Sequence, residues 1–346
     1  FVDRAAEDWT VVPKESYNCS IACAYDCTIN SGKFAGFTAS MCGGGENIEG
    51  AAAMIGIEDP DEALALTDHF DGMGIDSSVA GALMGMCYEL YERELLSPQD
   101  TGGLELNWGN FDSAVTLIDQ MCSGEGFGGR VLAKGLKEAA ALLGPPAEAC
   151  VLHIRGGGIN LHDWRPAWSV LLGQIVAGAG VCWQGPGVDA WTSEPDLGYT
   201  EIAEPFITEG KAEAVAKTQA KKLWEDSLGV CWFACWGVKD VLPNSAKAIE
   251  LATGWKDFDQ EEALAVGERL INMQRIIAIK RGFTPKDEFD VSDRLLEAPT
   301  EGRAAGKTIK PHLEGMVKDY YGEMGWEDTG RPTEATLEKV GLAGEL

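Results

Sequence analysis

Two short acidic motifs with the same pattern offer the clearest chemistry in the sequence. They are Asp71-Gly-Met-Gly-Ile-Asp76 and Asp226-Ser-Leu-Gly-Val-Cys231, and both follow Asp-x-x-Gly-aliphatic-(Asp or Cys). A carboxylate accepts two parallel hydrogen bonds, so it suits a planar ring with adjacent N–H donors, such as a pterin. Glycine lets the backbone approach the ring closely. Because one Asp-x-x-Gly is common at helix ends and turns, it is the repetition that favours two similar sites for one roughly symmetric ligand.

Cysteines cluster near the start of the chain. Cys19, Cys23 and Cys27 are spaced four apart, while Cys231 and Cys235 form a distant pair. A regular helix rises about 12 Å over eight residues, too far for three thiolates to hold one compact cluster, so a shared metal site requires a looped backbone. Iron–sulfur clusters are commonly held by four thiolates, and Cys231 is the first candidate for the fourth, with Cys235 second. Zinc and unligated cysteines are the alternatives, although four-cysteine zinc sites usually have paired, short-spaced ligands.

Composition restricts the class of partner. The 346 residues carry 28 basic and 55 acidic side chains, a formal net charge of -27, which disfavours nucleic acid and anionic membranes. The longest apolar run, 169–183, is broken by Gln174 and glycines and is too short to span a bilayer. We read no secretory signal and expect a cytoplasmic protein. The start at Phe1, close to the cysteines, suggests a fragment or processed chain whose N-terminal part is absent.

The segments that must position these motifs are predicted to be mainly helical. Residues 1–50 are rich in loop signals, whereas apolar periodicity predicts helices over most of the remaining chain. The segment 211–229 is an amphipathic helix that delivers Asp226 near its C-terminal end. Asp76 and the serines after it are expected to cap the next helix. Pro145-Pro146 marks the best domain boundary, so we predict domains of residues 1–147 and 148–346.

Further short motifs occur along the whole chain. They are Ser78-Val-Ala-Gly-Ala-Leu, Glu89-Leu-Tyr-Glu92, Gly126-Phe-Gly-Gly-Arg-Val-Leu-Ala-Lys-Gly135, His162-Asp-Trp-Arg165, Thr253-Gly-Trp255, Gly267-Glu-Arg269, Arg281-Gly-Phe283, Tyr320-Tyr321, Gly325-Trp326 and Gly330-Arg-Pro332. In order and spacing, and together with the two acidic motifs, they resemble the C-terminal two-domain half of the aldehyde:ferredoxin oxidoreductase family of tungsten- or molybdenum-bispterin enzymes. The resemblance implies an all-α fold of two multihelical domains that face each other across a cofactor site.

The resemblance also implies where the cofactors bind. Asp71, Gly74 and Asp76 would contact one pterin, and Asp226 with the Gly229-Val230 backbone would contact the other. The cofactor would be a tungsten (or molybdenum) bis-pterin, a tungstopterin, with Mg²⁺ bridging the pterin phosphates.

A [4Fe-4S] cluster is the second cofactor that the resemblance implies. Its ligands would be Cys19, Cys23, Cys27 and Cys231. Family cysteines usually have two and then three intervening residues, whereas this chain has three and three. Cys231 would tie the cluster directly to a pterin contact.

Glu46 is the candidate for the family's active-site glutamate, because counting back from Gly56-Ile57 places it there. A general base needs a raised pKa, which burial beside a metal cofactor could bring about. The alternative is that Glu46 or Glu49 caps a helix start. The clearest departure from the family is at 180–183, where aldehyde-oxidising members carry Arg-Gly-Ala-Cys-His and this chain has Trp183 in place of the histidine. None of the four histidines obviously replaces it.

The expected function is therefore oxidation of aldehydes, or reduction of the corresponding acids, by an anaerobic enzyme that acts on a small molecule with ferredoxin as electron partner. One alternative is a tungsten subunit resembling class II benzoyl-coenzyme A reductase. Another, from a different class, is an iron–sulfur electron relay that is inactive without its N-terminal pterin-binding domain. A homo-oligomer or a larger redox complex is expected.

Overall fold

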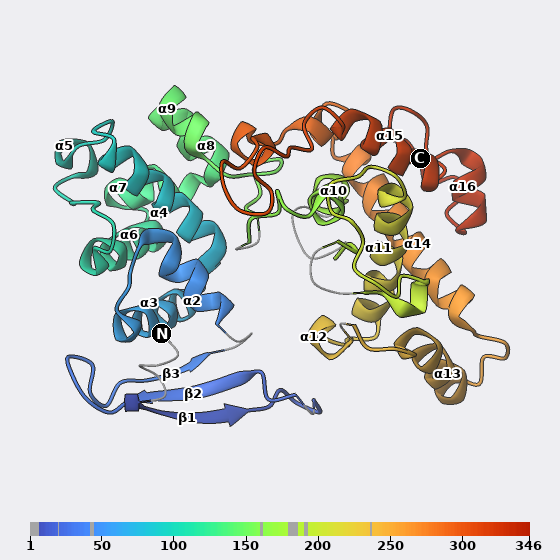
Figure 1. The fold of residues 1–346 in the computed structure, drawn as a ribbon, viewed down its shortest axis with the longest axis horizontal. Helices are drawn as coiled ribbons and strands as arrows, with labels where there is room; N and C mark the ends of the chain where they lie inside the picture. The colour runs from blue at the N-terminus through green and yellow to red at the C-terminus, as the bar shows by residue number, and fades with distance from the viewer. Residues whose placement is uncertain are drawn as a thin grey trace. The chain divides into compact units, whose positions relative to one another are not determined.

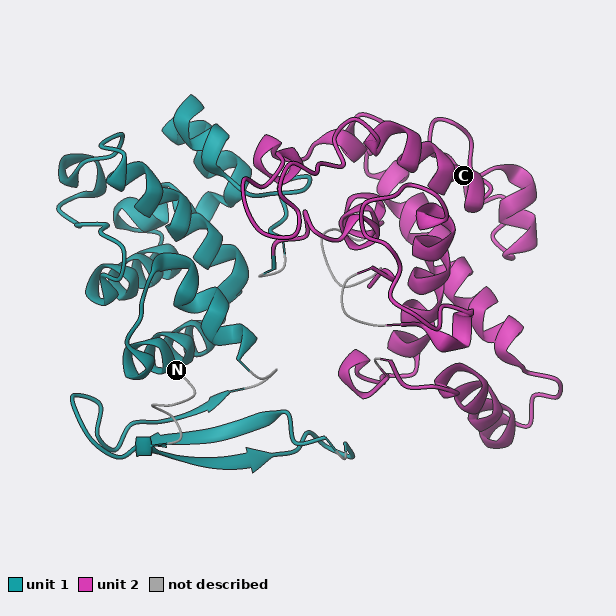
Figure 2. Ribbon diagram, viewed as in Figure 1, with its two compact units in different colours: residues 1–162 teal, residues 163–346 magenta. Residues whose placement is uncertain are grey.

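The computed structural model describes most of the chain. The described residues are 7–19, 21–41, 45–159, 162–178, 186–189, 193–235 and 237–346. The chain divides into two compact units, Phe1–His162 and Asp163–Leu346, here called unit 1 and unit 2 (Figure 2). The predicted boundary between residues 147 and 148 falls inside a short helix, Pro145–Cys150. One acidic motif lies in each unit.

Unit 1 begins with a small antiparallel sheet (Figure 1). Its strands, in the order β1-β2-β3, are β1 (Trp9–Lys14), β2 (Ala24–Ile29) and β3 (Thr38–Met41). Successive side chains of a strand point to opposite faces, and the buried side chains Cys27, Ile29, Ala39 and Met41 belong to the core of unit 1. The loop expected for residues 1–50 is therefore wrong for these three segments.

Helices form the rest of unit 1. They are α2 (Glu46–Ala51), η1 (Ala53–Ile55), α3 (Pro60–Met73), α4 (Ser77–Glu92), α5 (Pro98–Thr101), α6 (Phe111–Ser123), α7 (Gly126–Arg130), η2 (Leu132–Lys134), α8 (Leu136–Leu143) and α9 (Pro145–Cys150). Helix α4 contributes much of the core, with nine buried residues between Ala80 and Leu90. Helix α3 starts as predicted, with Pro60 in its first turn and the Asp59 carboxylate accepting from two backbone amides.

Unit 2 is helical in its described parts. Its elements are α10 (Trp168–Val176), η3 (Pro195–Leu197), α11 (Lys211–Ser227), α12 (Trp232–Cys235), α13 (Val241–Thr253), α14 (Gln260–Lys280), η4 (Asp287–Phe289), η5 (Asp293–Leu296), α15 (Leu313–Glu323) and α16 (Glu334–Lys339). All of α10 is buried, as its apolar composition predicts. Helix α11 packs closely on α14, since a Cβ on Gly267 would lie 1.9 Å from the Ala220 carbonyl oxygen. The chain is thus rich in helix, with one small sheet among its described residues.

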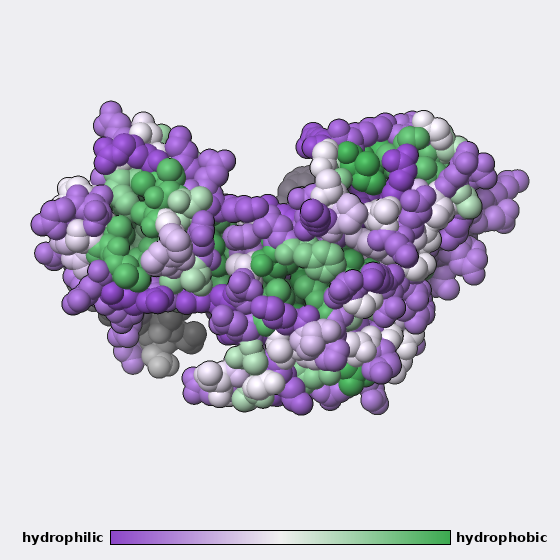
Figure 3. Space-filling view, turned by 90° about the horizontal axis from the view of Figure 1, so that it is seen from above, coloured by the Kyte–Doolittle hydropathy of each residue, from purple (hydrophilic) through white to green (hydrophobic). Residues whose placement is uncertain are grey.

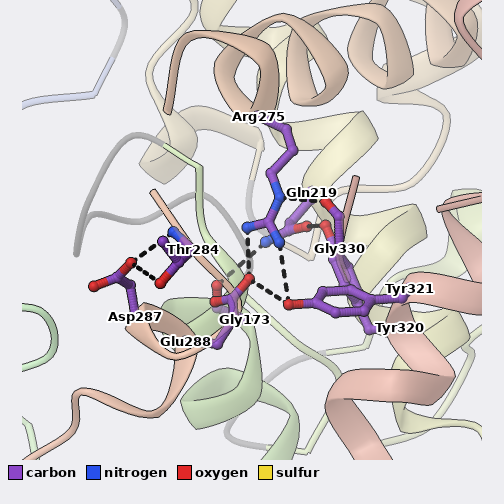
Figure 4. A network of polar contacts seen from close by, with 9 residues as sticks. All are labelled: Gly173, Gln219, Arg275, Thr284, Asp287, Glu288, Tyr320, Tyr321 and Gly330. Carbon is purple, nitrogen blue, oxygen red and sulfur yellow. Dashed lines mark hydrogen bonds and ion pairs between the residues drawn. The ribbon is translucent and has the colours of Figure 1, made fainter. Parts of the chain in front are cut away.

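A buried arginine organises the core of unit 2 (Figure 4). The side chain of Arg275 is 2% exposed, and its Nη1 donates to Glu288 Oε1 at 2.6 Å. Its Nε donates to the Gly330 carbonyl at 2.7 Å, and its Nη2 donates to the Tyr321 hydroxyl at 3.1 Å. Gly330 has φ 70°, and a Cβ there would lie 2.0 Å from Arg275 Nη2, so the site requires glycine. Two sequence motifs, those containing Tyr321 and Gly330, therefore serve this core.

The surface carries both hydrophilic and apolar residues. Figure 3 shows apolar patches set among predominantly hydrophilic residues. No helix of the described ranges is long and apolar enough to cross a membrane.

Candidate functional site

The first acidic motif forms the C-terminal end of α3. The Gly74 amide donates to the Asp71 carbonyl at 3.1 Å, and the Ile75 amide donates to the Phe70 carbonyl at 3.1 Å. Together these bonds make a Schellman motif, whose glycine takes a left-handed conformation, here with φ 69°. The Asp71 side chain is exposed on the surface. Neighbouring atoms still shield its carboxyl partly from water, and this burial, followed by the charge of Asp68, raises the pKa of the carboxyl.

The second acidic motif repeats this geometry at the end of α11. The Gly229 amide donates to the Asp226 carbonyl at 3.0 Å, and the Val230 amide donates to the Glu225 carbonyl at 3.2 Å. Gly229 has φ 69°, the value found at the first motif's glycine. The Asp226 carboxylate forms an ion pair with Lys222 one turn earlier. The predicted position of Asp226 near a helix C-terminus is confirmed.

Both motifs are open to an incoming ligand. A Cβ added to Gly74 or Gly229 would meet no described atom within 4 Å. The Asp71 and Asp226 side chains are exposed beside these glycines. A planar ring could therefore lie over either glycine while the neighbouring carboxylate accepts hydrogen bonds from its edge. The residues of each motif thus fit the donor edge of a pterin.

The last residue of each motif starts the next helix. Asp76 is the N-cap of α4, and its Oδ1 accepts from the Val79 amide at 2.8 Å, as predicted. Cys231 is exposed just before α12, and its carbonyl accepts from the Ala234 amide at 2.9 Å. Cys235 is buried on α12, and burial raises the pKa of its thiol to about 11.

Glu46 is placed by glycine-mediated packing of α2 and η1 on α4. A Cβ on Gly81 would lie 2.0 Å from the Gly50 carbonyl oxygen, and one on Gly85 would lie 3.0 Å from the Met54 carbonyl oxygen. The two contacts advance by one helical turn in both segments, so α2 and α4 run in the same direction. One turn back along this register, Glu46 at the start of α2 comes beside the first turn of α4, next to the end of the first acidic motif.

The Glu46 carboxylate is paired with a histidine. The N-cap of α2 is Gly45, and no described side chain caps this helix, so Glu46 occupies the first helical position rather than the cap. Its Oε1 lies 3.4 Å from His162 Nε2, and the two side chains are 38% and 33% exposed. Sequence reasoning missed this pairing because the partners are 116 residues apart; only the position of His162 in a matched motif hinted at a role.

The N-terminal cysteines do not form a cluster site as they are placed. Cys27 is fully buried in β2, where burial and then the nearby Asp26 charge raise the pKa of its thiol. Cys19 and Cys23 are half-buried, and four residues of extended chain separate Cys23 from Cys27 by about 13 Å. Among the residues that the structure describes, no group of three or more His, Cys, Asp or Glu side chains could hold a metal ion. Cys27 in particular does not fit a thiolate ligand.

Of the three tryptophans Trp168, Trp183 and Trp191, only Trp168 lies among the described residues. Residues 180–183, with Trp183, and also Trp191 lie outside the described residues. Trp168 is 3% exposed at the start of α10. Its ring packs against Phe206 and His312, with centroids 5.8 and 5.4 Å apart, as expected of a core residue.

Comparisons with known proteins show which family the chain belongs to. The model of the family "Aldehyde ferredoxin oxidoreductase, domains 2 & 3" matches residues 3–342. A tungsten-containing aldehyde ferredoxin oxidoreductase of Pyrococcus furiosus is 27% identical over 302 residues, which cover 86% of this chain and 48% of that protein. The "aliphatic sulfonate oxidoreductase, WOR-like subunit" of the same organism is 27% identical over 301 residues, covering 83% and 44%.

A solved structure has the same fold. The active site complex BamBC of benzoyl coenzyme A reductase, in complex with 1,5-dienoyl-CoA, superposes with a TM-score of 0.78 at 20% identity, over 99% of this chain and 54% of that chain. This chain spans about half the length of the curated relatives that it matches. With a family model that covers nearly all of its residues, the chain belongs to the aldehyde ferredoxin oxidoreductase family.

Proposed function

We propose that the whole protein is a tungsten- (or molybdenum-) bispterin oxidoreductase that interconverts aldehydes and the corresponding acids with ferredoxin as electron partner. The observation that carries the proposal is the duplicated motif, in which an exposed aspartate precedes an open, left-handed glycine at the end of a long helix. Membership of a family whose relatives are named for tungsten and ferredoxin supports it. An N-terminal pterin-binding domain, Mg²⁺ at the pterin phosphates and a larger redox complex belong to the same proposal.

Each motif has a defined part in the proposal. Asp71, Gly74 and Asp76 bind the donor edge of one pterin, and Asp226 with the Gly229-Val230 backbone binds the other. When bound, the metal cofactor supplies the two-electron chemistry. The protein binds and orients it, and Glu46 acts as the general base beside the first motif.

Removal of either aspartate tests the binding role. Asp71→Asn and Asp226→Asn each remove charge-assisted hydrogen bonds, so we expect a loss of about 1.5–3 kcal/mol, roughly a tenfold to hundredfold drop in cofactor affinity. Tungsten and pterin content after anaerobic purification of the full-length protein measures this. Asp319→Asn, at an exposed aspartate of α15, is the matched control and should keep full tungsten content. Normal tungsten and pterin content in both motif variants would contradict the assignment.

Activity assays test the reaction itself. The full-length enzyme should reduce ferredoxin when it is supplied with aldehydes. A second candidate, an aromatic-ring reductase like benzoyl-coenzyme A reductase, is favoured by Trp183 in place of the family histidine, and the shared fold is compatible with it. Turnover of aromatic thioesters without turnover of aldehydes would establish the second candidate, and inactivity on both would exclude the two together.

An iron–sulfur cluster at Cys19, Cys23, Cys27 and Cys231 is the part of the proposal that fits the structure least. Because Cys27 points into the core of unit 1, we derive no electron-transfer step through this site. If Cys27 is a ligand, Cys27→Ser should abolish most bound iron and sulfide. Cys87→Ser, at a fully buried core cysteine of α4, is the control and should retain them.

The iron content of the Cys27→Ser variant decides whether Cys27 is a cluster ligand, as the resemblance implies, or only a buried strand residue. Iron in the wild type that survives Cys27→Ser would remove Cys27 from the ligand set, as its position in β2 indicates. Iron absent from the wild type, with zinc in its place, would exclude the cluster. An electron relay without catalysis would show iron and sulfide but little tungsten.

A further inference from the structure

Two segments that are far apart in sequence meet at the first turn of α4. Helix α2, which begins with Glu46, is fixed there by the Gly50–Gly81 contact. Gly158, four residues before His162, packs on the same part of α4, since a Cβ on Gly158 would lie 2.8 Å from Val79 Cγ2. Both Glu46 and His162 thus lie close in sequence to residues that pack on the N-terminal part of one helix.

The pair has the right groups for proton transfer. His162 Nε2 and Glu46 Oε1 are 3.4 Å apart, and hydrogen bonds of this kind are often long before substrate binds. Imidazole can both accept and donate a proton, and the His162 side chain is 33% exposed, so water can reach it. The neighbouring Asp163 does not compete for the ring, because its carboxylate accepts four hydrogen bonds from Arg165.

We propose that His162 is the group that receives the proton collected by Glu46, and so serves this site where the sequence has Trp183 instead of the family histidine. The inference rests on the proposed function of Glu46. In the transfer, the O–H bond of the Glu46 carboxylic acid breaks and an N–H bond forms at His162 Nε2. That step restores the Glu46 carboxylate, and the imidazolium then releases its Nδ1 proton to water, which leaves neutral imidazole with the proton on Nε2. Exchange of ring protons with water returns the starting tautomer, with the proton on Nδ1 and Nε2 able to accept again. No electron changes place, and no further reactant is needed.

Unit 1 contains a matched control pair. His69 Nε2 lies 2.8 Å from Asp119 Oδ1, with side chains 30% and 56% exposed. Its chemistry is the same, a histidine ring facing one carboxylate, but its two residues come from α3 and α6. Glu49 on α2 and the Asp163–Arg165 pair are the charged side chains within three residues of Glu46 or His162 in sequence, and Asp76 caps α4. Each stays unchanged in the variants below.

The first measurement tests the pair without enzyme activity. Histidine ring signals are followed by NMR as a function of pH in the full chain. Glu46→Gln should change the ring signals of His162 and leave those of His69 unchanged, because only the His162 ring faces Glu46. Asp119→Asn should change the ring signals of His69 and leave those of His162 unchanged. His162 ring signals that do not respond to Glu46→Gln overturn the proposal, because the pair is then not formed in solution.

The second measurement tests the role of the pair. In the tungsten-loaded full-length enzyme, His162→Gln should lower kcat at least about tenfold, leave KM unchanged and flatten one limb of the pH–rate profile. His69→Gln should change none of these, and thermal unfolding confirms that both variants fold. An unchanged kcat and pH profile in His162→Gln overturns the relay even if the pair is present. A wild type inactive on aldehydes and aromatic thioesters overturns the proposed function and the relay with it, while the NMR titration still reports whether the two side chains interact.

Discussion

Replacement of Arg275 by methionine should destabilise the protein by about 3–5 kcal/mol, because it removes the guanidinium that balances the charge of the buried Glu288 carboxylate. The guanidinium also loses its hydrogen bonds to Gly330 and Tyr321. Its centre lies 4.4 Å from the Phe283 ring centroid, so a cation–π contact is lost as well. Thermal and urea unfolding of the full chain measure the loss, and it should reduce the amount of soluble protein in cells.

The double variant Arg275→Met/Glu288→Gln separates the causes. It removes the uncompensated charge, so it should recover a large part of the stability lost in Arg275→Met. Lys318→Met on α15 is the control, because Lys318 and Glu314 form an exposed pair in the same unit and their separation should leave the unfolding midpoint unchanged. If Arg275→Met is as stable as the wild type, this core tolerates the Glu288 carboxylate without the guanidinium.

The second large effect is expected at Lys221. Its Nζ lies 3.0 Å from Glu194 Oε2 and 2.8 Å from Glu225 Oε1, and all three side chains are 3–4% exposed. One ammonium therefore balances two buried carboxylates. Lys221→Met leaves both carboxylates unpaired, and we expect a loss of about 3–5 kcal/mol near neutral pH.

The sign of the pH dependence follows from the carboxyl groups. Burial raises the pKa of both Glu194 and Glu225, against the opposing effect of Lys221. The folded protein thus binds these protons more tightly than the unfolded chain. Their contribution to stability is complete below the unfolded value of about 4.3 and is lost as the pH rises through the raised folded values. Attraction to the two carboxylates outweighs burial and raises the pKa of Lys221, so its own contribution is lost only at strongly alkaline pH.

Unfolding at about pH 5 and about pH 8 tests this balance. The loss caused by Lys221→Met should be larger at the higher pH, where the unpaired carboxylates must ionise. Glu225→Gln should weaken the pH dependence, since it leaves one carboxylate for one ammonium. Lys217→Met, which breaks the exposed Lys217–Glu213 pair of the same helix, is the control and should not depend on pH in this way. A Lys221→Met loss that is equal at both pH values would mean that the carboxylates are not coupled to Lys221.

Local rules predicted the helical frame of the site well. The apolar periodicity of residues 211–229 indicated α11, and Asp76 was expected to begin the helix that it caps. Asp-x-x-Gly at a helix end was the blander interpretation of both acidic motifs, and the two glycines do cap helices. In the structure both glycines cap their helices and are also exposed, with no described atom within 4 Å of a Cβ added to either. Such features depend on neighbours within one or two helical turns, so the sequence displays them directly.

Contacts between segments that are distant in sequence were harder to predict. The sheet escaped prediction because β3 has only four residues, Thr38–Met41, and its stability comes from pairing with β2 and from the core. The spacing of the cysteines predicted a looped metal site. In the structure Cys27 is instead a buried residue of β2, between the less buried Asp26 and Thr28. The contact of Glu46 with His162 and the requirement for glycine at position 330 are set by segments distant in sequence, and no local pattern reports them.

The position of both aspartates at helix ends has an electrostatic consequence for the ligand. The backbone dipoles of α3, with 14 residues, and of α11, with 17, place partial negative charge where Asp71 and Asp226 lie. This field strengthens each carboxylate as a hydrogen-bond acceptor and repels anions. A ligand that carries both an N–H-rich ring and phosphate groups would therefore enter these two helix ends ring first. Its phosphates would have to be bound by helix N-termini or cations elsewhere in the protein.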